Sequence, residues 1–227
     1  MVYNQAKAKM KKTVLMLITV VTAGMLAVSC GGGSNGSEGN AQGQSGKVLS
    51  KVVSVIQDAK KQADKLEAKA KDCNDMECLG KIMDESKKAK EAYETNLQKA
   101  IESASGKSIA TEVQDFPVKV SVPATVVKMS KGKRPNCDME LELTEDITVN
   151  NTKETFAYLM YITFVDKEGN KINDKAVSLF GDYKVQFGQV IPAGTKFKHS
   201  FDIPISEKNV DKWENFEKIV LKKKSNN

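Results

Sequence analysis

The sequence DCNDMEC at residues 72–78 divides a long helix-forming stretch, residues 47–105, into two halves. On each side of it, apolar residues recur at the spacing of one helix face. They are Leu49, Val52, Ile56, Ala59, Ala63, Leu66 and Ala70 before it, and Leu79, Ile82, Ala89, Tyr93, Leu97, Ala100 and Ala104 after it. Asn and Asp favour a turn followed by a helix N-cap, and helices joined by a short turn lie antiparallel. Residues 47–105 are therefore predicted to form an α-hairpin.

The predicted hairpin has a small hydrophobic core. Its apolar stripes contain many alanines, and each buried methylene contributes only about 0.8 kcal/mol. Polar Ser86 and Asn96 lie near the second stripe and weaken it further. We therefore expect the hairpin to depend on the rest of the chain, on a partner or on a covalent cross-link.

Two cysteines flank the turn of the predicted hairpin. A disulfide between Cys73 and Cys78 would close a short loop, which contributes about 2 kcal/mol in the chain-entropy model. The alternative is two unpaired thiols packed at the tip. Cys137 is then either a small buried apolar residue at the start of a strand or a partner for one of the other two. Four residues separate Cys73 from Cys78, which excludes a Cys-x-x-Cys redox motif.

The composition changes near Gly106, and strand patterns follow. Residues 138–143, DMELEL, alternate between charged and apolar side chains, as in a half-buried strand. Val118, Val120 and Val122 do the same until Pro123 interrupts them. Residues 156–165, FAYLMYITFV, are apolar on both faces, which predicts a central strand covered on each side.

The remaining strands are short and separated by turns. Residues 166–169, DKEG, form a predicted turn, and a new strand resumes near Ile172. Residues 183–191 and 197–205 are predicted strands on either side of the turn PAG at 192–194. One or two helical turns within 207–214 and a closing strand at 216–221 complete the chain. About seven short strands with frequent turns are typical of a β-sandwich.

Three segments of this region resemble the FxLYD-type immunoglobulin-like domain of bacterial envelope proteins. They are NNT at residues 150–152, the strand and turn TFVDKEGNKI at 163–172, and IPAGTKF at 191–197. The resemblance covers residues 138–221. It implies an immunoglobulin-like sandwich and transfers no catalytic residue. The expected fold class is α+β, with an N-terminal antiparallel α-hairpin followed by an immunoglobulin-like β-sandwich over residues 108–222.

The N-terminus is typical of an export signal. A lysine-rich stretch precedes residues 13–28, TVLMLITVVTAGMLAV. This apolar run is shorter than the roughly 20 residues of a membrane span and suits a secretory signal. Either Met1 or Met10 is the natural start.

Residues 26–30, LAVSC, resemble the bacterial lipobox, whose cysteine becomes the acylated N-terminus. The resemblance implies a signal peptide at residues 1–29, lipid on Cys30 and a flexible tether at 30–46. It also implies a partner, the membrane, and a place in the cell envelope. We expect the outer membrane, with the body in the periplasm or on the surface. The alternatives are an ordinary signal peptide and an uncleaved anchor.

The charge of the chain gives no sign of a nucleic-acid partner. The chain has 35 basic and 29 acidic residues, but residues 1–29 contain four lysines and no acid, so the mature chain carries a net charge of only +2. No basic stripe with interleaved aromatic residues is present in the sequence.

The sequence indicates no metal or cofactor. His199 is the only histidine, and we expect it to face solvent on a strand rather than bind zinc or serve a catalytic triad. Asp72, Asn74, Asp75 and Glu77 lack the glycine and distal glutamate of a calcium-binding EF-hand loop. Helix capping explains them equally well.

No residue is singled out as catalytic. Glu140 and Glu142 are expected on the exposed face of a strand, where solvation explains them. The aromatic residues that could contribute to a binding patch are Tyr158, Tyr161, Tyr183, Trp213 and Phe216. Trp213, just before the closing strand, is better explained as a core residue.

The function expected from these observations is that of a non-catalytic, membrane-anchored envelope lipoprotein. It would bind or position another envelope component, either protein or glycan. One alternative is a periplasmic or surface hydrolase with an unrecognised carboxylate site. Another is a passive spacer, in which the hairpin only lifts the sandwich away from the membrane.

Overall fold

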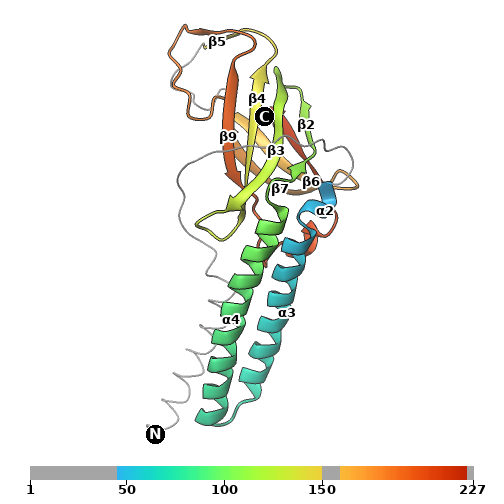
Figure 1. Cartoon of the computed structure of the whole chain (residues 1–227), viewed down its shortest axis with the longest axis vertical. Coiled ribbons are helices and arrows are strands. Elements are labelled where there is room, and N and C mark those ends of the chain that lie inside the picture. The colour runs from blue at the N-terminus through green and yellow to red at the C-terminus, as the bar shows by residue number, and fades with distance from the viewer. Residues whose placement is uncertain (1–44, 150–158, 224–227) are drawn as a thin grey trace.

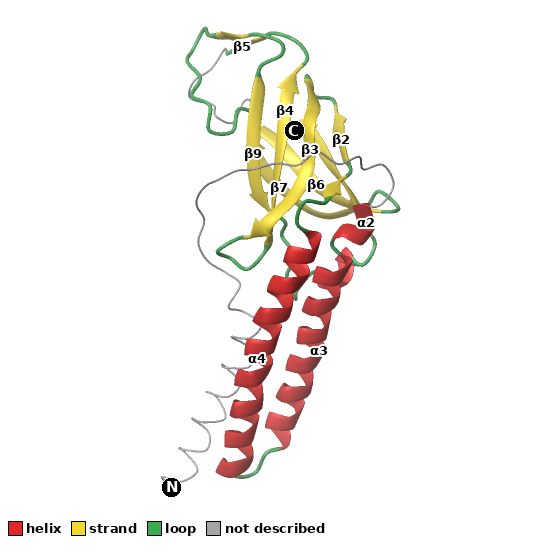
Figure 2. Cartoon of the chain, in the orientation of Figure 1, coloured by secondary structure: helices red, strands yellow, loops and turns green. Residues whose placement is uncertain are grey.

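The computed structural model describes residues 45–149 and 159–223, which form an elongated body (Figure 1). The helices lie at one end of this body and the strands at the other (Figure 2). The predicted α+β fold, an α-hairpin followed by a β-sandwich, is confirmed. Among the described residues, no helix combines the length and apolarity needed to cross a bilayer.

The hairpin consists of α3 (Ser50–Asp72) and α4 (Met76–Ala104), preceded by the single turn α2 (Ser45–Val48). Every residue of the two predicted apolar stripes is buried. At 1.5 Å per residue, α3 is about 35 Å long and α4 about 43 Å. Ser86 occupies the inner stripe of α4 and is 1% exposed, whereas Asn96 faces solvent.

The sandwich contains two four-stranded sheets. The first has the order β1-β3-β4-β9, and the second β2-β10-β6-β7. Their bounds are β1 (Ser108–Ile109), β3 (Val118–Met129), β4 (Pro135–Leu143), β9 (Lys196–Asp202), β2 (Thr111–Gln114), β10 (Phe216–Lys223), β6 (Leu159–Asp166) and β7 (Lys171–Ser178). A small separate ladder pairs β5 (Ile147–Thr148) with β8 (Val190–Ile191). A 3-10 turn, η1 (Val210–Trp213), precedes β10.

The alternating pattern at residues 138–143 lies within β4, and the segment that is apolar on both faces includes most of β6. On β4, Met139, Leu141 and Leu143 are buried. β6 lies in the centre of its sheet between β10 and β7, and Thr163 and Val165 are buried on the face opposite Phe164. The strand is therefore covered on both faces. Residues 156–158 of the predicted strand lie outside the described residues.

The expectation that Pro123 ends its strand is wrong. The register of β3 against β4 shifts between Val120 and Val122 and again between Val122 and Thr125. Such bulges accommodate a proline, which has no N–H to donate to the ladder. They also change which side chains face inward, so that Val122 is 45% exposed and Ala124 is buried.

Most of the strand predicted at residues 183–191 is irregular. Only the two residues of β8 are extended in a ladder. Gly181 (φ 55°) and Gly188 (φ 76°) adopt the left-handed conformation, which turns the chain instead of extending it. At Gly181 a side chain would also meet the backbone oxygen of Lys198 at 2.9 Å.

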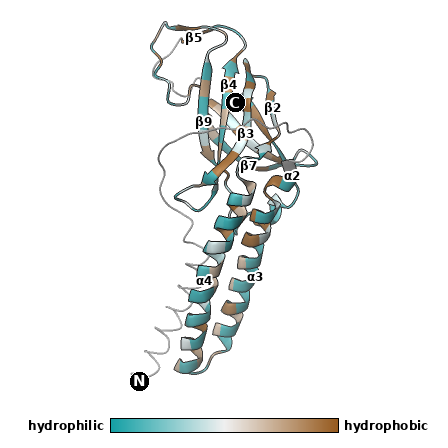
Figure 3. Ribbon diagram, viewed as in Figure 1, coloured by the Kyte–Doolittle hydropathy of each residue, from teal (hydrophilic) through white to brown (hydrophobic). Residues whose placement is uncertain are grey.

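The hydrophobic core of the sandwich continues into the nearer half of the hairpin. Leu49, Val52 and Ile56 of the helical end belong to the same buried cluster as Trp213 and Phe164. The farther half forms a second, separate cluster, made of Ala63, Leu66, Ala70, Cys73, Leu79, Ile82 and Ala89. Hydrophilic residues line much of the outer side of α4 (Figure 3). Of the three supports that the sequence left open for the hairpin, the rest of the chain thus supplies one, and only for the nearer half.

Candidate functional site

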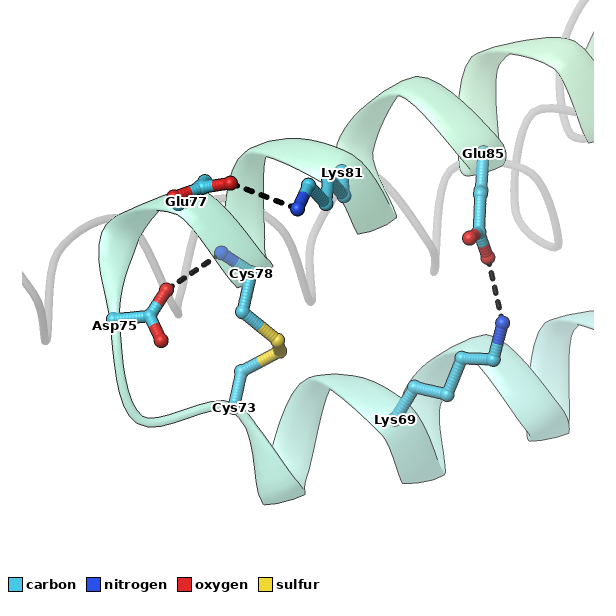
Figure 4. The surroundings of a disulfide bond; sticks show 7 residues. All are labelled: Lys69, Cys73, Asp75, Glu77, Cys78, Lys81 and Glu85. Atoms are coloured by element: carbon cyan, nitrogen blue, oxygen red, sulfur yellow. Dashed lines mark hydrogen bonds and ion pairs between the residues drawn. A yellow bond between two sulfur atoms is a disulfide. The ribbon is translucent and has the colours of Figure 1, made fainter.

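The tip of the hairpin is closed by a disulfide. Cys73 and Cys78 are bonded to each other, with their Cα atoms 5.8 Å apart (Figure 4). Asp75 is the N-cap of α4, and its Oδ1 accepts a hydrogen bond of 2.7 Å from the backbone N–H of Cys78. The disulfide and the helix cap together fix the conformation of the turn between α3 and α4.

The charged residues around the disulfide pair with one another. Glu77 and Lys81 are 2.8 Å apart on α4, and Lys69 of α3 reaches Glu85 of α4 at the same distance (Figure 4). They line a shallow, open depression. In residues 45–149 and 159–223, no group of three or more His, Cys, Asp or Glu side chains is arranged to hold a metal ion. Asp75 caps α4, and Glu77 forms an ion pair with Lys81.

Cys137 is a free thiol in the core. It lies on β4 opposite Val126 and Phe201, and it is fully buried. Burial raises the pKa of its thiol well above the ordinary value, which keeps it protonated. The sequence left open whether Cys137 is a small buried apolar residue or a disulfide partner. In the structure it is a buried residue with a free thiol.

The expectation that His199 faces solvent is wrong. Residues alternate along β9, so His199 points inward with Phe197 and Phe201 and is 7% exposed. Its charged neighbour Lys198 takes the outward position. Burial lowers the pKa of His199, and its Nε2 has no hydrogen-bond partner. The imidazole is therefore a neutral core group next to the turn at Gly181.

Glu140 and Glu142 are less exposed than expected. Their side chains are only 16% and 18% exposed because lysines from neighbouring strands lie over them. Lys119 of β3 binds Glu142 at 2.5 Å, and Lys196 of β9 approaches Glu140 at 3.5 Å. These two acids take part in cross-strand ion pairs on the outer face of the sheet.

A buried carboxyl lies where the hairpin meets the sandwich. Glu207 is 6% exposed, and its Oε1 has no hydrogen-bond partner. Burial, reinforced by Asp64 and opposed by Lys60, raises the pKa of Glu207 to about 7. Burial, together with the charge of Glu207, also raises the pKa of Tyr93 on α4. The burial of Glu207 was not visible in the sequence, because it depends on the packing of the hairpin against this segment, whereas Tyr93 already lay on the predicted apolar stripe of the second helix.

Little space is available beside this junction. The cavity between α3 and α4 measures about 10 Å³, and its lining consists of Ala59, Gln62, Ala63, Leu66, Ser86, Ala89 and Tyr93. Ser86 Oγ has no hydrogen-bond partner there. Small-molecule sites usually have volumes of about 300–1,000 Å³. The cavity is therefore a packing defect rather than a substrate pocket.

The aromatic residues proposed as a binding patch do not gather in one place. Trp213 and Phe216 are buried, with ring centroids 5.2 Å and 6.2 Å from that of Phe164. Trp213 is thus a core residue, as expected. Tyr161 is half-buried on β6, and Tyr183 is 48% exposed. Tyr158 and the predicted lipidation site Cys30 lie outside the described residues.

Tyr183 belongs to a surface that the sequence interpretation missed. The segment 179–191, called the distal loop here, also exposes Phe187 (71%) and Val190 (55%). Its base pairs with β5, which is labelled at the end of the sandwich farthest from the hairpin (Figure 1). The sequence of residues 183–191 predicted a strand instead of this loop. The two bracketing glycines, Gly181 and Gly188, were the signal for a loop.

The distal loop has a defined conformation. The backbone N–H of Tyr183 donates to Phe180 O, and that of Gly188 donates to Val149 O. Gln189 Oε1 accepts from the backbone N–H of Gln186 at 2.9 Å. The ring of Tyr183 packs edge-on against buried Phe197, with centroids 5.7 Å apart. The loop therefore presents Phe187 and Val190 outward from a structured base.

No protein-family model, curated protein or solved structure matches this chain.

Proposed function

We propose that this chain is a non-catalytic lipoprotein of the bacterial cell envelope that binds or positions another envelope component. One observation carries the proposal. The core shared by the hairpin and the sandwich joins them into one elongated body, and the two ends of that body differ in chemistry. The hairpin tip is polar and charged, whereas the distal loop exposes three large apolar side chains.

The point of attachment supports a positioning role. The lipobox-like LAVSC at residues 26–30 places the lipid shortly before Ser45, where the described chain begins. α2, which starts at Ser45, contacts β1 and β10 at the base of the sandwich. The lipid tether thus joins the body near its middle, and each end is free to contact a different component.

The acidic groups give little support to a hydrolase. Glycoside cleavage uses two carboxyl groups on opposite sides of the bond that is broken. Burial raises the pKa of Glu207 to about 7, as a general acid requires, but Glu207 is not among the residues that line the cavity between α3 and α4, which measures only about 10 Å³. Glu140 and Glu142 are ion-paired on an open sheet face.

The arrangement of strands supports the resemblance to the FxLYD-type immunoglobulin-like domain. Strands β3 and β4, which pair with each other, lie with β9 in one sheet. Strands β6 and β7, which also pair with each other, lie with β10 in the other sheet. From β3 onward the chain thus changes sheets after β4, after β7 and after β9, and such crossings between two sheets are typical of sandwiches of the immunoglobulin class.

Site-specific photo-crosslinking of the full chain in intact cells tests the binding role. Photo-reactive residues at Lys65 and Lys88, both exposed on the hairpin, should give an adduct with the same protein or glycan. The matched control is Lys175, an exposed residue on β7. Adducts from Lys175 alone would move the binding surface to the sandwich. Absence of any adduct would favour a passive spacer.

A variant with a shortened hairpin provides a second test of the binding role. Deleting residues 47–105 would remove Leu49, Val52 and Ile56 from the core of the sandwich, so the loss of binding would be uninformative. Replacing residues 63–89 by a Gly-Asn-Gly turn removes only the separate outer cluster. This variant should keep its sandwich and lose the captured component. Undiminished capture would exclude the outer half of the hairpin as the binding element.

A further inference from the structure

The large apolar side chains that are exposed in the described residues are concentrated in the distal loop. They are Val122, Tyr183, Phe187 and Val190, of which the last three belong to that loop. We propose that the distal loop docks on the surface of a lipid bilayer, with Phe187, Tyr183 and Val190 entering the boundary between headgroups and acyl chains. The inference rests on the proposed lipid anchor and deepens the proposed function by orienting the body.

The size of the patch favours a bilayer over a protein partner. A stable protein interface buries about 800 Å² on each partner and involves about 20–30 residues a side. Three side chains, the aromatic ones burying at most about 150–250 Å² each, fall short of that area. A patch this small suffices on a membrane, because a lipid anchor on the same chain already holds it there at high effective concentration.

The chemistry of the loop fits the interfacial layer. Aromatic side chains concentrate at the level of the headgroups, and tyrosine is suited to it because its ring is apolar and its hydroxyl is polar. Tyr183 is held by Phe197 beneath it, so the loop has a fixed base. Phe187, 71% exposed, is the most exposed of the large apolar side chains in the described residues, and it lies between Gln186 and Gly188 in the sequence.

The length of the tether favours the same orientation. Fourteen residues, numbers 31–44, separate Cys30 from Ser45, and a chain of that length reaches at most about 50 Å when fully extended. With the hairpin pointing at the bilayer, Ser45 would stand off by up to the length of α4, about 43 Å. With the sandwich facing the bilayer, the distance is set by strands such as β4, whose nine residues span about 30 Å. The second arrangement extends the tether less.

The charge of the loop determines which lipids it accepts. Asp182 and Lys184 flank Tyr183, and their charges cancel. Docking should therefore occur on zwitterionic vesicles and change little with ionic strength, unlike the binding of polybasic segments to anionic lipid. In this orientation the hairpin projects away from the bilayer, toward the component that it positions.

Fluorescent labels on the full lipidated chain test this orientation. The labels are attached at Gln186→Cys, an exposed position of the loop beside Phe187, and at Asp84→Cys, an exposed position of α4. The native cysteines do not compete, because Cys73 and Cys78 are bonded and Cys137 is buried. The protein is reconstituted into zwitterionic phosphatidylcholine vesicles, with or without nitroxide-labelled lipid. Flotation is measured first.

The expected result is a blue-shifted emission at residue 186 that nitroxide lipid quenches at least twofold, with no change at residue 84. Replacing Tyr183 and Val190 by serine should reduce the quenching, whereas Val122→Ser, the matched control, should not. If the chain floats but the label at residue 186 stays in water, or the label at residue 84 is quenched instead, the proposed docking is wrong while the proposed lipid anchor is retained. A chain that does not float overturns the proposed anchor and the docking with it.

Discussion

Lys60 of α3 and Asp211 of η1 lie 151 residues apart in sequence and are joined by a hydrogen bond of 2.5 Å between Nζ and Oδ2. This contact connects the hairpin to the sandwich. Gln57 and Glu214 form a second such link between α3 and the segment after η1. Both contacts lie at the edge of the shared core, which includes Ile56.

The ion pair contributes less to this junction than the apolar contact beside it. The Lys60 and Asp211 side chains are 37% and 66% exposed, and exposed pairs of this kind are worth about 0–1 kcal/mol. Ile56 is 2% exposed, so Ile56→Ala should cost about 2–5 kcal/mol of unfolding free energy. Lys60→Ala should cost less than about 1 kcal/mol. Urea unfolding measures both, and equal losses would contradict the ranking.

Glu207 should make the stability of the chain depend on pH. Its pKa is about 7 in the folded state and near 4.5 in the unfolded chain, so the folded state binds the additional proton between these values. Its contribution to stability is fully present below pH 4.5 and is lost as pH rises through 7. Glu207→Gln, which mimics the protonated acid, should therefore stabilise the protein at pH 8 and leave it unchanged at pH 4.

The gain at pH 8 should be about 1–3 kcal/mol, since one pKa unit corresponds to about 1.4 kcal/mol. Unfolding by urea at pH 4, 6 and 8 measures it. Glu217→Gln, on an exposed position of β10, is the matched control and should show no such pH dependence. A gain for Glu207→Gln that is the same at all three pH values would show that titration is not the cause.

Removing the disulfide should loosen only the outer half of the hairpin. Cys73→Ala combined with Cys78→Ala should lower the local unfolding free energy by about 2 kcal/mol. Because the outer cluster is separate from the shared core, hydrogen exchange should accelerate in residues 63–89 and not in β4 or β6. Reduction of the native protein should reproduce the effect. Faster exchange throughout the sandwich would show that the two clusters are coupled.

Cys30 should be required for membrane attachment. Cys30→Ala removes the thiol that would carry the lipid, so the chain should not incorporate an alkyne analogue of palmitate and should leave the membrane fraction. Ser29→Ala keeps a small residue before the cysteine and should behave as the native chain does. Palmitate incorporation into the Cys30→Ala chain would exclude this cysteine as the lipidated residue.

Local sequence patterns were sufficient to predict burial wherever it depends on only one face of a single helix or strand. The spacing of Leu49, Val52 and Ile56, and the alternation of Met139, Leu141 and Leu143, predict which side chains become buried. The period of a helix or a strand fixes which residues share a face, and burial follows from that alone. The same rule applied to β9 would have placed His199 between Phe197 and Phe201 in the core.

Contacts between distant segments decided the rest. Pro123 continues its strand because β4 accommodates two bulges, and residues 183–189 leave the sheet because Gly181 and Gly188 turn the chain. Glu207 is buried only because α3 and α4 dock on the segment that contains it. The sequence by itself determined the helices, most of the strands and the polarity of their faces, since these depend on neighbours a few residues away. The tertiary structure alone decided which groups are buried at the junction and which apolar side chains are exposed, because both depend on segments that pack from far along the chain.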